Sequence, residues 1–241
     1  MSHPVLVKAE KLIRVGDIVG AEAALASIVD SDGDGALMVA LDDLAAKDLL
    51  AVLRDFDSSK ESVVNLLVSP EQFARAIVLE RRYGDQSHER LHGMINSVIF
   101  RPDGDPDEFL EAIGEVEGGC DVLADYLCER SENIEHFFRT GSFDFFADAD
   151  ADDAYDDMSD EERLDALSDP GANRAILSHS EVNDHDWMEL AWTLRYHSPE
   201  IFRDVLLILR ARAQAGEAAG AAVEVPMAER PPAEPEEESA L

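Results

Sequence analysis

Two short runs of residues in this chain have the types and the spacing that chemistry at a metal ion requires. The first is His88-Glu89-Arg90-Leu91-His92, a literal HExxH sequence. On a helix, two histidines four residues apart share one face and can bind Zn²⁺, and the glutamate can act as general base on metal-bound water. The motif therefore predicts a zinc hydrolase site at His88, Glu89 and His92.

The residues around this motif favour a simpler interpretation. Arg90 places a permanent positive charge beside the dication, and the glycine and third histidine of the extended metalloprotease motif are missing. No third ligand is evident, although Glu108 and Glu111 follow within reach along the chain. We therefore favour two histidines on a helix face that bind no metal, and we keep the zinc hydrolase as an alternative.

The second run, from Asp30 to Gly35, matches the first half of an EF-hand loop. Such a loop places carboxylates at positions 1, 3 and 5 and a glycine at position 6. Position 12 should be a bidentate glutamate but is Leu41, with Asp42 one residue later. The predicted Ca²⁺ or Mg²⁺ site consists of Asp30, Asp32, Asp34 and Asp42. The alternative is an ordinary turn between helices, in which Asp34 caps the second one.

A third candidate site lies where aromatic residues give way to acidic ones. Exposed aromatic rings beside carboxylates can dock a basic partner protein. The alternative is that the rings anchor a loop onto the helical body. The residues of this predicted partner-binding segment are Phe143, Phe145, Phe146, Asp148, Asp150 and Asp152.

The charge of the chain limits its partners. Its 241 residues carry a formal net charge of −33. Residues 144–169 contain twelve acids and one arginine, a net of −11, and residues 214–241 contain seven glutamates and one arginine, a net of −6. An acidic field repels phosphate backbones and anionic membrane surfaces, so we expect no direct nucleic-acid binding and no membrane insertion. A protein partner with a basic surface is the expected alternative.

The elements that must position these residues are helical, because apolar residues recur at helical spacing and strand patterns are almost absent. Ser159-Asp160-Glu161-Glu162 is a capping-box sequence, which predicts a helix starting there. Short amphipathic helices must stack on neighbours to bury their apolar faces. The predicted helices cover residues 5–15, 17–29, 37–55, 59–68, 70–83, 87–100, 106–116, 120–130, 133–139, 159–167, 173–178, 184–196 and 199–214.

The predicted fold is all-α, a superhelical or solenoid-like array of short helices. We divide the chain into an N-terminal superhelix (1–140), an acidic low-complexity loop (141–158), a C-terminal helical subdomain (159–214) and a disordered tail rich in Ala, Pro and Glu (215–241). Residues 1–19 lack the basic region, apolar region and cleavage site of a secretory leader, so we expect none, and no run of 18 apolar residues occurs. We therefore expect a cytoplasmic protein.

Residues 37–130 resemble the N-terminal helical superhelix of MgtE-type magnesium transporters and a related bacterial family of unknown function. Four runs carry the resemblance: residues 41–44 (LDDL), 48–53 (DLLAVL), 66–71 (LLVSPE) and 74–77 (ARAI). The CBS domains and membrane helices of the transporters are missing, so transport is not implied. The resemblance implies a superhelix that docks a partner under divalent-cation control.

Together these patterns predict a non-enzymatic cytoplasmic interaction module, an adaptor or regulator that uses a helical groove and an acidic surface to bind a protein. Two alternatives remain open: a divalent-cation-responsive module built on the Asp30 loop, and the HExxH zinc hydrolase. We expect no cofactor other than Ca²⁺ or Mg²⁺.

Overall fold

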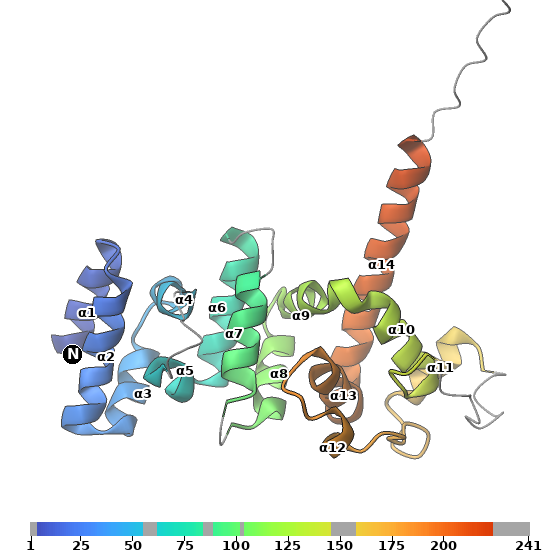
Figure 1. The fold of residues 1–241 in the computed structure, drawn as a ribbon, viewed down its shortest axis with the longest axis horizontal. Coiled ribbons are helices and arrows are strands. Elements are labelled where there is room, and N and C mark those ends of the chain that lie inside the picture. The colour runs from blue at the N-terminus through green and yellow to red at the C-terminus, as the bar shows by residue number, and fades with distance from the viewer. Residues whose placement is uncertain (1–3, 55–61, 84–88, 102–103, 146–157, 224–241) are drawn as a thin grey trace, which may run out of the picture. The chain divides into compact units, whose positions relative to one another are not determined.

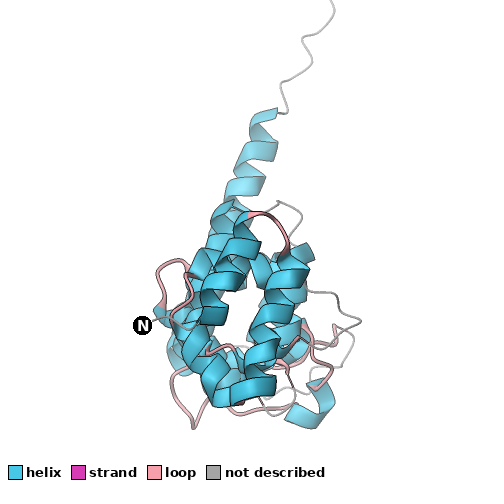
Figure 2. Ribbon diagram, turned by 90° about the vertical axis from the view of Figure 1, so that its left-hand side faces the viewer, coloured by secondary structure: helices cyan, strands magenta, loops and turns pink. Residues whose placement is uncertain are grey.

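A computed structural model describes residues 4–54, 62–83, 89–101, 104–145 and 158–223. In these ranges the chain is helical or in loops and turns, with no strand (Figure 2). The all-α prediction is confirmed for this part of the chain.

The helices follow one another with short connections, in the order labelled in Figure 1. They are α1 (Pro4–Arg14), α2 (Ile18–Asp32), α3 (Asp34–Asp42), α4 (Ala46–Arg54), α5 (Val63–Leu67), α6 (Pro70–Tyr83), α7 (Glu89–Ile99), α8 (Pro106–Glu115), α9 (Gly119–Leu127), the 3₁₀ turn η1 (Cys128–Arg130), α10 (Ser131–Thr140), α11 (Asp160–Ala166), α12 (His179–Val182), α13 (Trp187–His197) and α14 (Pro199–Val223).

The chain divides into two compact units, Met1–Leu209 and Arg210–Leu241. Within the first unit, helices close in sequence pack side by side: α1 on α2, α2 on α3, α4 on α6, and α6 on α8. Their buried apolar side chains form one core. The predicted division at residues 140, 158 and 214 stays a prediction, and residues 146–157 of the expected acidic loop lie outside the described ranges.

Helix α6 shows how local sequence fixes an element in this core. Ser69 and Gln72 form reciprocal hydrogen bonds at its start: Gln72 N donates to Ser69 Oγ at 3.3 Å, and Ser69 N donates to Gln72 Oε1 at 3.1 Å. Its buried face includes Phe73 and Ile77, one turn apart. Phe73 meets Phe109 of α8 edge to face, with ring centroids 5.8 Å apart, so the capped helix is fixed against its neighbour.

Several helices differ from the sequence predictions, three of them in more than their end residues. The predicted helix 37–55 is interrupted after Asp42; Leu44 N donates to Leu41 O, and the Ala45 carbonyl then accepts from Asp48 and Leu49 as α4 begins. The predicted helix 173–178 is absent, and α12 begins at residue 179. Helix α14 continues beyond residue 214 to Val223, into the segment expected to be the tail.

A tertiary contact explains why residues 173–178 are not helical. The Asn173 side-chain amide donates to the carbonyls of Leu167 (3.0 Å) and Arg195 (2.8 Å). Arg195 Nε donates back to Asn173 Oδ1 at 3.2 Å. These bonds tie the segment to α13, a partner that local sequence cannot reveal.

No helix among the described residues is long and apolar enough to cross a membrane.

Candidate functional site

The predicted metal loop at residues 30–41 is helical over almost its whole length. Helix α2 continues through Asp32, and α3 begins at Asp34, so Gly33 alone makes the turn. Gly33 has φ 84°, a conformation that favours glycine. Asp30 and Asp32 lie in the last turn of α2, and the Asp32 carboxylate accepts from Ser31 Oγ at 2.7 Å. The expected twelve-residue loop is therefore not formed in this structure.

Asp42, the predicted ligand at the far end of that loop, forms a hydrogen bond with a different helix. Asp42, the last residue of α3, accepts from Gln72 Nε2 of α6 at 2.6 Å. Nowhere in the described ranges do three or more His, Cys, Asp or Glu side chains gather as metal ligands would. Metal binding by Asp30, Asp32, Asp34 and Asp42 stays a prediction, which would require the end of α2 to rearrange.

The outward face of α3 is the more distinctive feature of this region. Leu37, Ala40 and Leu41 are buried against the core. The opposite face carries Met38 and Val39, which are 47% and 66% exposed. Gly35 and Asp42 complete this face because residues at i, i+3, i+4 and i+7 align along a helix. Large apolar side chains therefore stand in solvent on a helix that ends in an aspartate.

The part of the chain that forms this face contains acidic residues and no basic ones. From Val15 to Ala46, which covers α2 and α3, the chain contains seven acidic residues and no Lys, Arg or His. Five of the acids are exposed at the two ends of α3: Asp30, Asp32, Asp34, Asp42 and Asp43. We call Met38, Val39 and these five aspartates the α3 surface. Its apolar centre and acidic ends are complementary to a basic amphipathic segment.

The structure describes four of the five HExxH residues, Glu89 to His92. His88 lies outside the described residues, so the pairing of His88 with His92 stays untested. Glu89 and Arg90 are exposed in the first turn of α7. His92 packs its ring on that of Tyr126, with centroids 4.5 Å apart. Tyr126 donates to Asn96 Oδ1 at 2.6 Å, and burial raises the pKa of this phenol.

The aromatic segment after α10 divides between two environments. The ring of Phe143 stacks on Phe137, with centroids 4.1 Å apart, and meets Trp187 edge to face, so it belongs to the helical body. Phe145 is 52% exposed and stacks on His136. The other predicted residues of this segment, Phe146, Asp148, Asp150 and Asp152, lie outside the described ranges.

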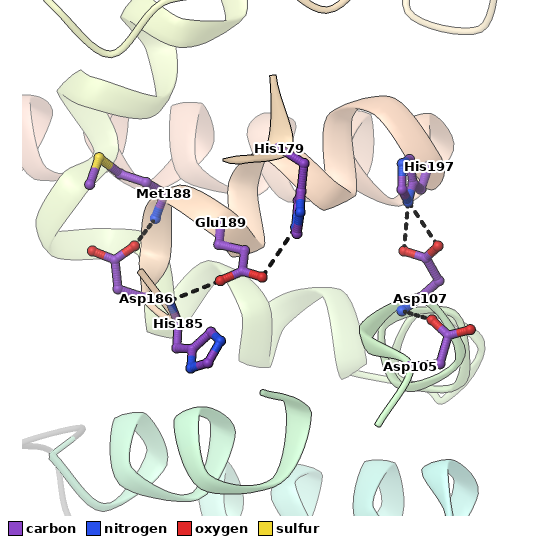
Figure 3. A network of polar contacts seen from close by, with 8 residues as sticks. All are labelled: Asp105, Asp107, His179, His185, Asp186, Met188, Glu189 and His197. Atoms are coloured by element: carbon purple, nitrogen blue, oxygen red, sulfur yellow. Dashed lines mark hydrogen bonds and ion pairs between the residues drawn. The ribbon is translucent and has the colours of Figure 1, made fainter. Parts of the chain in front are cut away.

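A buried carboxylate, Glu189, organises the chain between α12 and α13 (Figure 3). Its side chain is almost fully buried. Its carboxylate accepts from the backbone N–H of His185 at 2.8 Å and pairs with His179 Nε2 at 3.2 Å. His185 has φ 54°, which is strained for a residue with a side chain, and the bond to Glu189 helps to hold it there. Its ring points away from the carboxylate and stacks on Phe100.

A second polar pair in Figure 3 joins α13 to α8. His197 Nδ1 lies 2.8 Å from both carboxylate oxygens of Asp107. Both side chains are more than a third exposed, so the pair contributes little to stability. Like Glu189, it links helices.

The thiol of Cys120 is not activated. Burial, together with the carboxylates of Asp204 and Asp121, raises the pKa of Cys120. A raised pKa lowers the fraction of nucleophilic thiolate at neutral pH.

Among the sites described in this section, the geometry favours the α3 surface as the candidate functional site.

Comparison of the chain with protein-family models, with curated proteins and with solved structures finds no match.

The sequence contains a signal for the α3 surface that is not part of a metal-binding motif. The signal is the long stretch without a basic residue, Val15–Ala46, together with two adjacent apolar residues, Met38 and Val39, in a helix whose other apolar positions already form a complete stripe. The aspartate spacing of a metal loop does not include the apolar pair that lies between Asp34 and Asp42.

Proposed function

We propose that this chain is a non-enzymatic protein-interaction module, an adaptor or regulator in the cytoplasm, that binds a basic partner protein through the α3 surface. The observation that carries the proposal is the pair Met38 and Val39, exposed on α3 inside a stretch that has no basic residue. Exposed apolar side chains give contact area, and the surrounding carboxylates select a cationic partner.

The positions of the aspartates support this proposal. Asp30 and Asp42 lie in the last turns of α2 and α3, and neither helix has a basic residue there. A negative charge at the C-terminal end of a helix opposes the helix dipole and costs about 0.3–1 kcal/mol. Lysines or arginines of a bound partner would offset that cost. A basic partner would therefore also stabilise the C-terminal ends of α2 and α3.

The partner segment that fits best is an amphipathic helix with one apolar face bordered by Lys or Arg. The apolar face would cover Met38 and Val39, and the basic residues would reach the aspartates at both ends of α3. The aromatic segment adds a second contact in this proposal, since Phe145 is exposed beside an acidic stretch. The resemblance to the MgtE-type superhelix further suggests that residues 37–130 present the surface on a superhelical array.

The proposal is tested with a synthetic basic amphipathic peptide, with lysines on one face and leucines on the other, by fluorescence anisotropy on the full chain. The double variant Met38→Ser/Val39→Ser should weaken binding about tenfold, the loss of roughly 1.4 kcal/mol of apolar contact. The variant Asp42→Asn/Asp43→Asn should weaken it several-fold at low salt and less at high salt.

The matched control is Glu115→Gln/Glu117→Gln. It removes two exposed acids at and just after the end of α8, in a stretch of sequence whose large apolar residues are not exposed. This control should leave the affinity unchanged. A peptide of equal charge but without leucines should bind weakly. If it binds as tightly as the amphipathic peptide, or if the control variant loses as much affinity, the α3 surface is not the site.

A further inference from the structure

Away from the α3 surface, a cleft of about 620 Å³ lies between α4 and α7. This volume falls within the range of about 300–1,000 Å³ that is typical of small-molecule sites. Its apolar lining includes Leu53 from α4 and Met94 from α7. Its polar lining includes Arg54 and Arg90, two of only 20 Lys and Arg in a chain with 53 acids.

The space above α7 is open at Gly93. Gly93 lies inside the helix, and a Cβ placed on it would meet no atom within 4 Å. Neither close packing nor a positive φ requires glycine at this position. A glycine inside a helix costs about 0.5–1 kcal/mol relative to alanine. Its visible effect on the structure is the open space above α7, which a larger side chain would fill.

The hydrogen-bond donors of the cleft favour an anionic group. No described carboxylate forms an ion pair with Arg90. Asn96 Oδ1 already accepts from Tyr126, so its amide nitrogen remains available to donate. Arg54 is bound to the buried carboxylate of Glu80 and adds little net charge.

Glu89 limits how much negative charge the cleft can accept. Its carboxylate also lines the cleft, and the chain as a whole is strongly acidic. A ligand with several phosphates would meet repulsion from both. A ligand with one anionic group can reach Arg90 and place its remaining surface over the exposed Gly93, where Leu53 and Met94 line the cleft but are themselves almost fully buried.

We propose that the cleft between α4 and α7 binds a small organic acid, a single carboxylate on an apolar body. Arg90 binds the carboxylate, and the apolar body occupies the space above Gly93. This function is separate from the α3 surface, because no residue is common to the two sites.

The test uses the full chain and anilinonaphthalene sulfonate, a fluorescent probe with one anionic group on an apolar body. Octanoate should displace the probe, and octanol, which has the same chain without the charge, should require about tenfold higher concentration. Arg90→Gln should weaken probe and octanoate binding about tenfold, as expected for loss of a charge-assisted hydrogen bond. Arg75→Gln, an exposed arginine of α6 outside the cleft, should change nothing.

Two substitutions at Gly93 separate filling of the cleft from stabilisation of the helix. Gly93→Leu should abolish probe binding, and Gly93→Ala should retain most of it, while both keep or raise the melting temperature. Met38→Ser/Val39→Ser should leave octanoate-sensitive binding intact, so failure of the α3 proposal is distinguishable from failure of this one. Equal displacement by octanol and octanoate, or unchanged binding in both Arg90→Gln and Gly93→Leu, would overturn the proposal.

Discussion

Acidic residues have different roles in two regions of this protein. In the helices from α8 onwards, several described acids lie at helix starts and accept hydrogen bonds from the first turn, although others, such as Glu115 at the end of α8, do not. Asp105 accepts from Asp107 N at 3.0 Å, and Asp186 accepts from Met188 N at 2.8 Å. Capping boxes begin α11 with Ser159–Glu162 and α12 with Ser178–Glu181. These acids contribute to folding.

At the ends of α2 and α3 the placement is reversed. Asp30 and Asp42 lie in last turns, where negative charge opposes the helix dipole, and Met38 and Val39 are exposed between them. Folding alone does not account for this arrangement. In a chain with this many acids, the total charge does not show what each carboxylate does. The position of a carboxylate on its helix separates acids that stabilise the fold from acids that are available to a partner.

The largest expected effect is at the most buried of the structural acids. Glu189→Ala should lower the free energy of unfolding by about 3 kcal/mol, because the His185 N–H loses its acceptor and a cavity remains. Urea denaturation measures the loss. His179→Ala removes only the half-exposed partner of the same carboxylate and should cost less than about 1 kcal/mol. Similar costs for the two variants would show that Glu189 does not organise this turn.

A smaller effect is expected at a helix cap. Asp186→Ala should destabilise the protein by about 1 kcal/mol, since α13 loses the side chain that caps it. Asp186→Asn retains a capping oxygen and should stay close to the original stability. Thermal unfolding of the three proteins side by side provides the measurement, and an equal loss for Asn and Ala would point to charge instead of capping.

The comparison between the regions is sharpest for a pair of neighbouring aspartates. Asp30→Asn, in the last turn of α2, should raise the free energy of unfolding by about 0.5 kcal/mol. Asp34→Asn, in the first turn of α3, should lower it by a similar amount. Both effects should shrink with added salt. A loss of stability in both variants would contradict the view that Asp30 is unfavourable for folding.

The smallest effect concerns pH. Hydrogen bonds from Ser159 and Ser178 hold the pKa of Glu162 and Glu181 below that of an unfolded glutamate. Their contribution is therefore fully present above the unfolded pKa and is lost as pH falls through the lowered folded values. Glu162→Gln should make unfolding slightly less sensitive to acid over this range. Circular dichroism during an acid titration tests this, and an unchanged acid profile would exclude a role for the cap.

Local sequence predicted several of these features because their causes are local. The capping box at Ser159 and the bounds of the helix from Pro70 to Tyr83 are confirmed. A cap needs only residues three apart, and an apolar stripe needs only its own periodicity. For the same reason the all-helical class could be predicted, since it rests on spacing repeated along the chain.

Features that depend on distant partners could not be predicted in this way. Asn173 resembles the start of a helix in sequence, but its side chain bonds to Arg195, 22 residues away. The aspartates after residue 29 match half of a calcium loop. The apolar side of α2 is buried in the core, however, and the helix continues to Asp32. The sequence around Gly93 does not indicate a cleft, because the cleft forms only where α4 lies near α7.

The acidic charge follows from composition, and the helical class and the helix caps follow from residues within a few positions of one another. Which side chains stay exposed follows from the tertiary structure. Burial of Leu37 and Leu41 left Met38 and Val39 outside, and the packing of α7 near α4 left Arg90 at an open cleft. Exposure depends on which surfaces neighbouring helices cover, and that is settled by contacts between segments far apart in the chain.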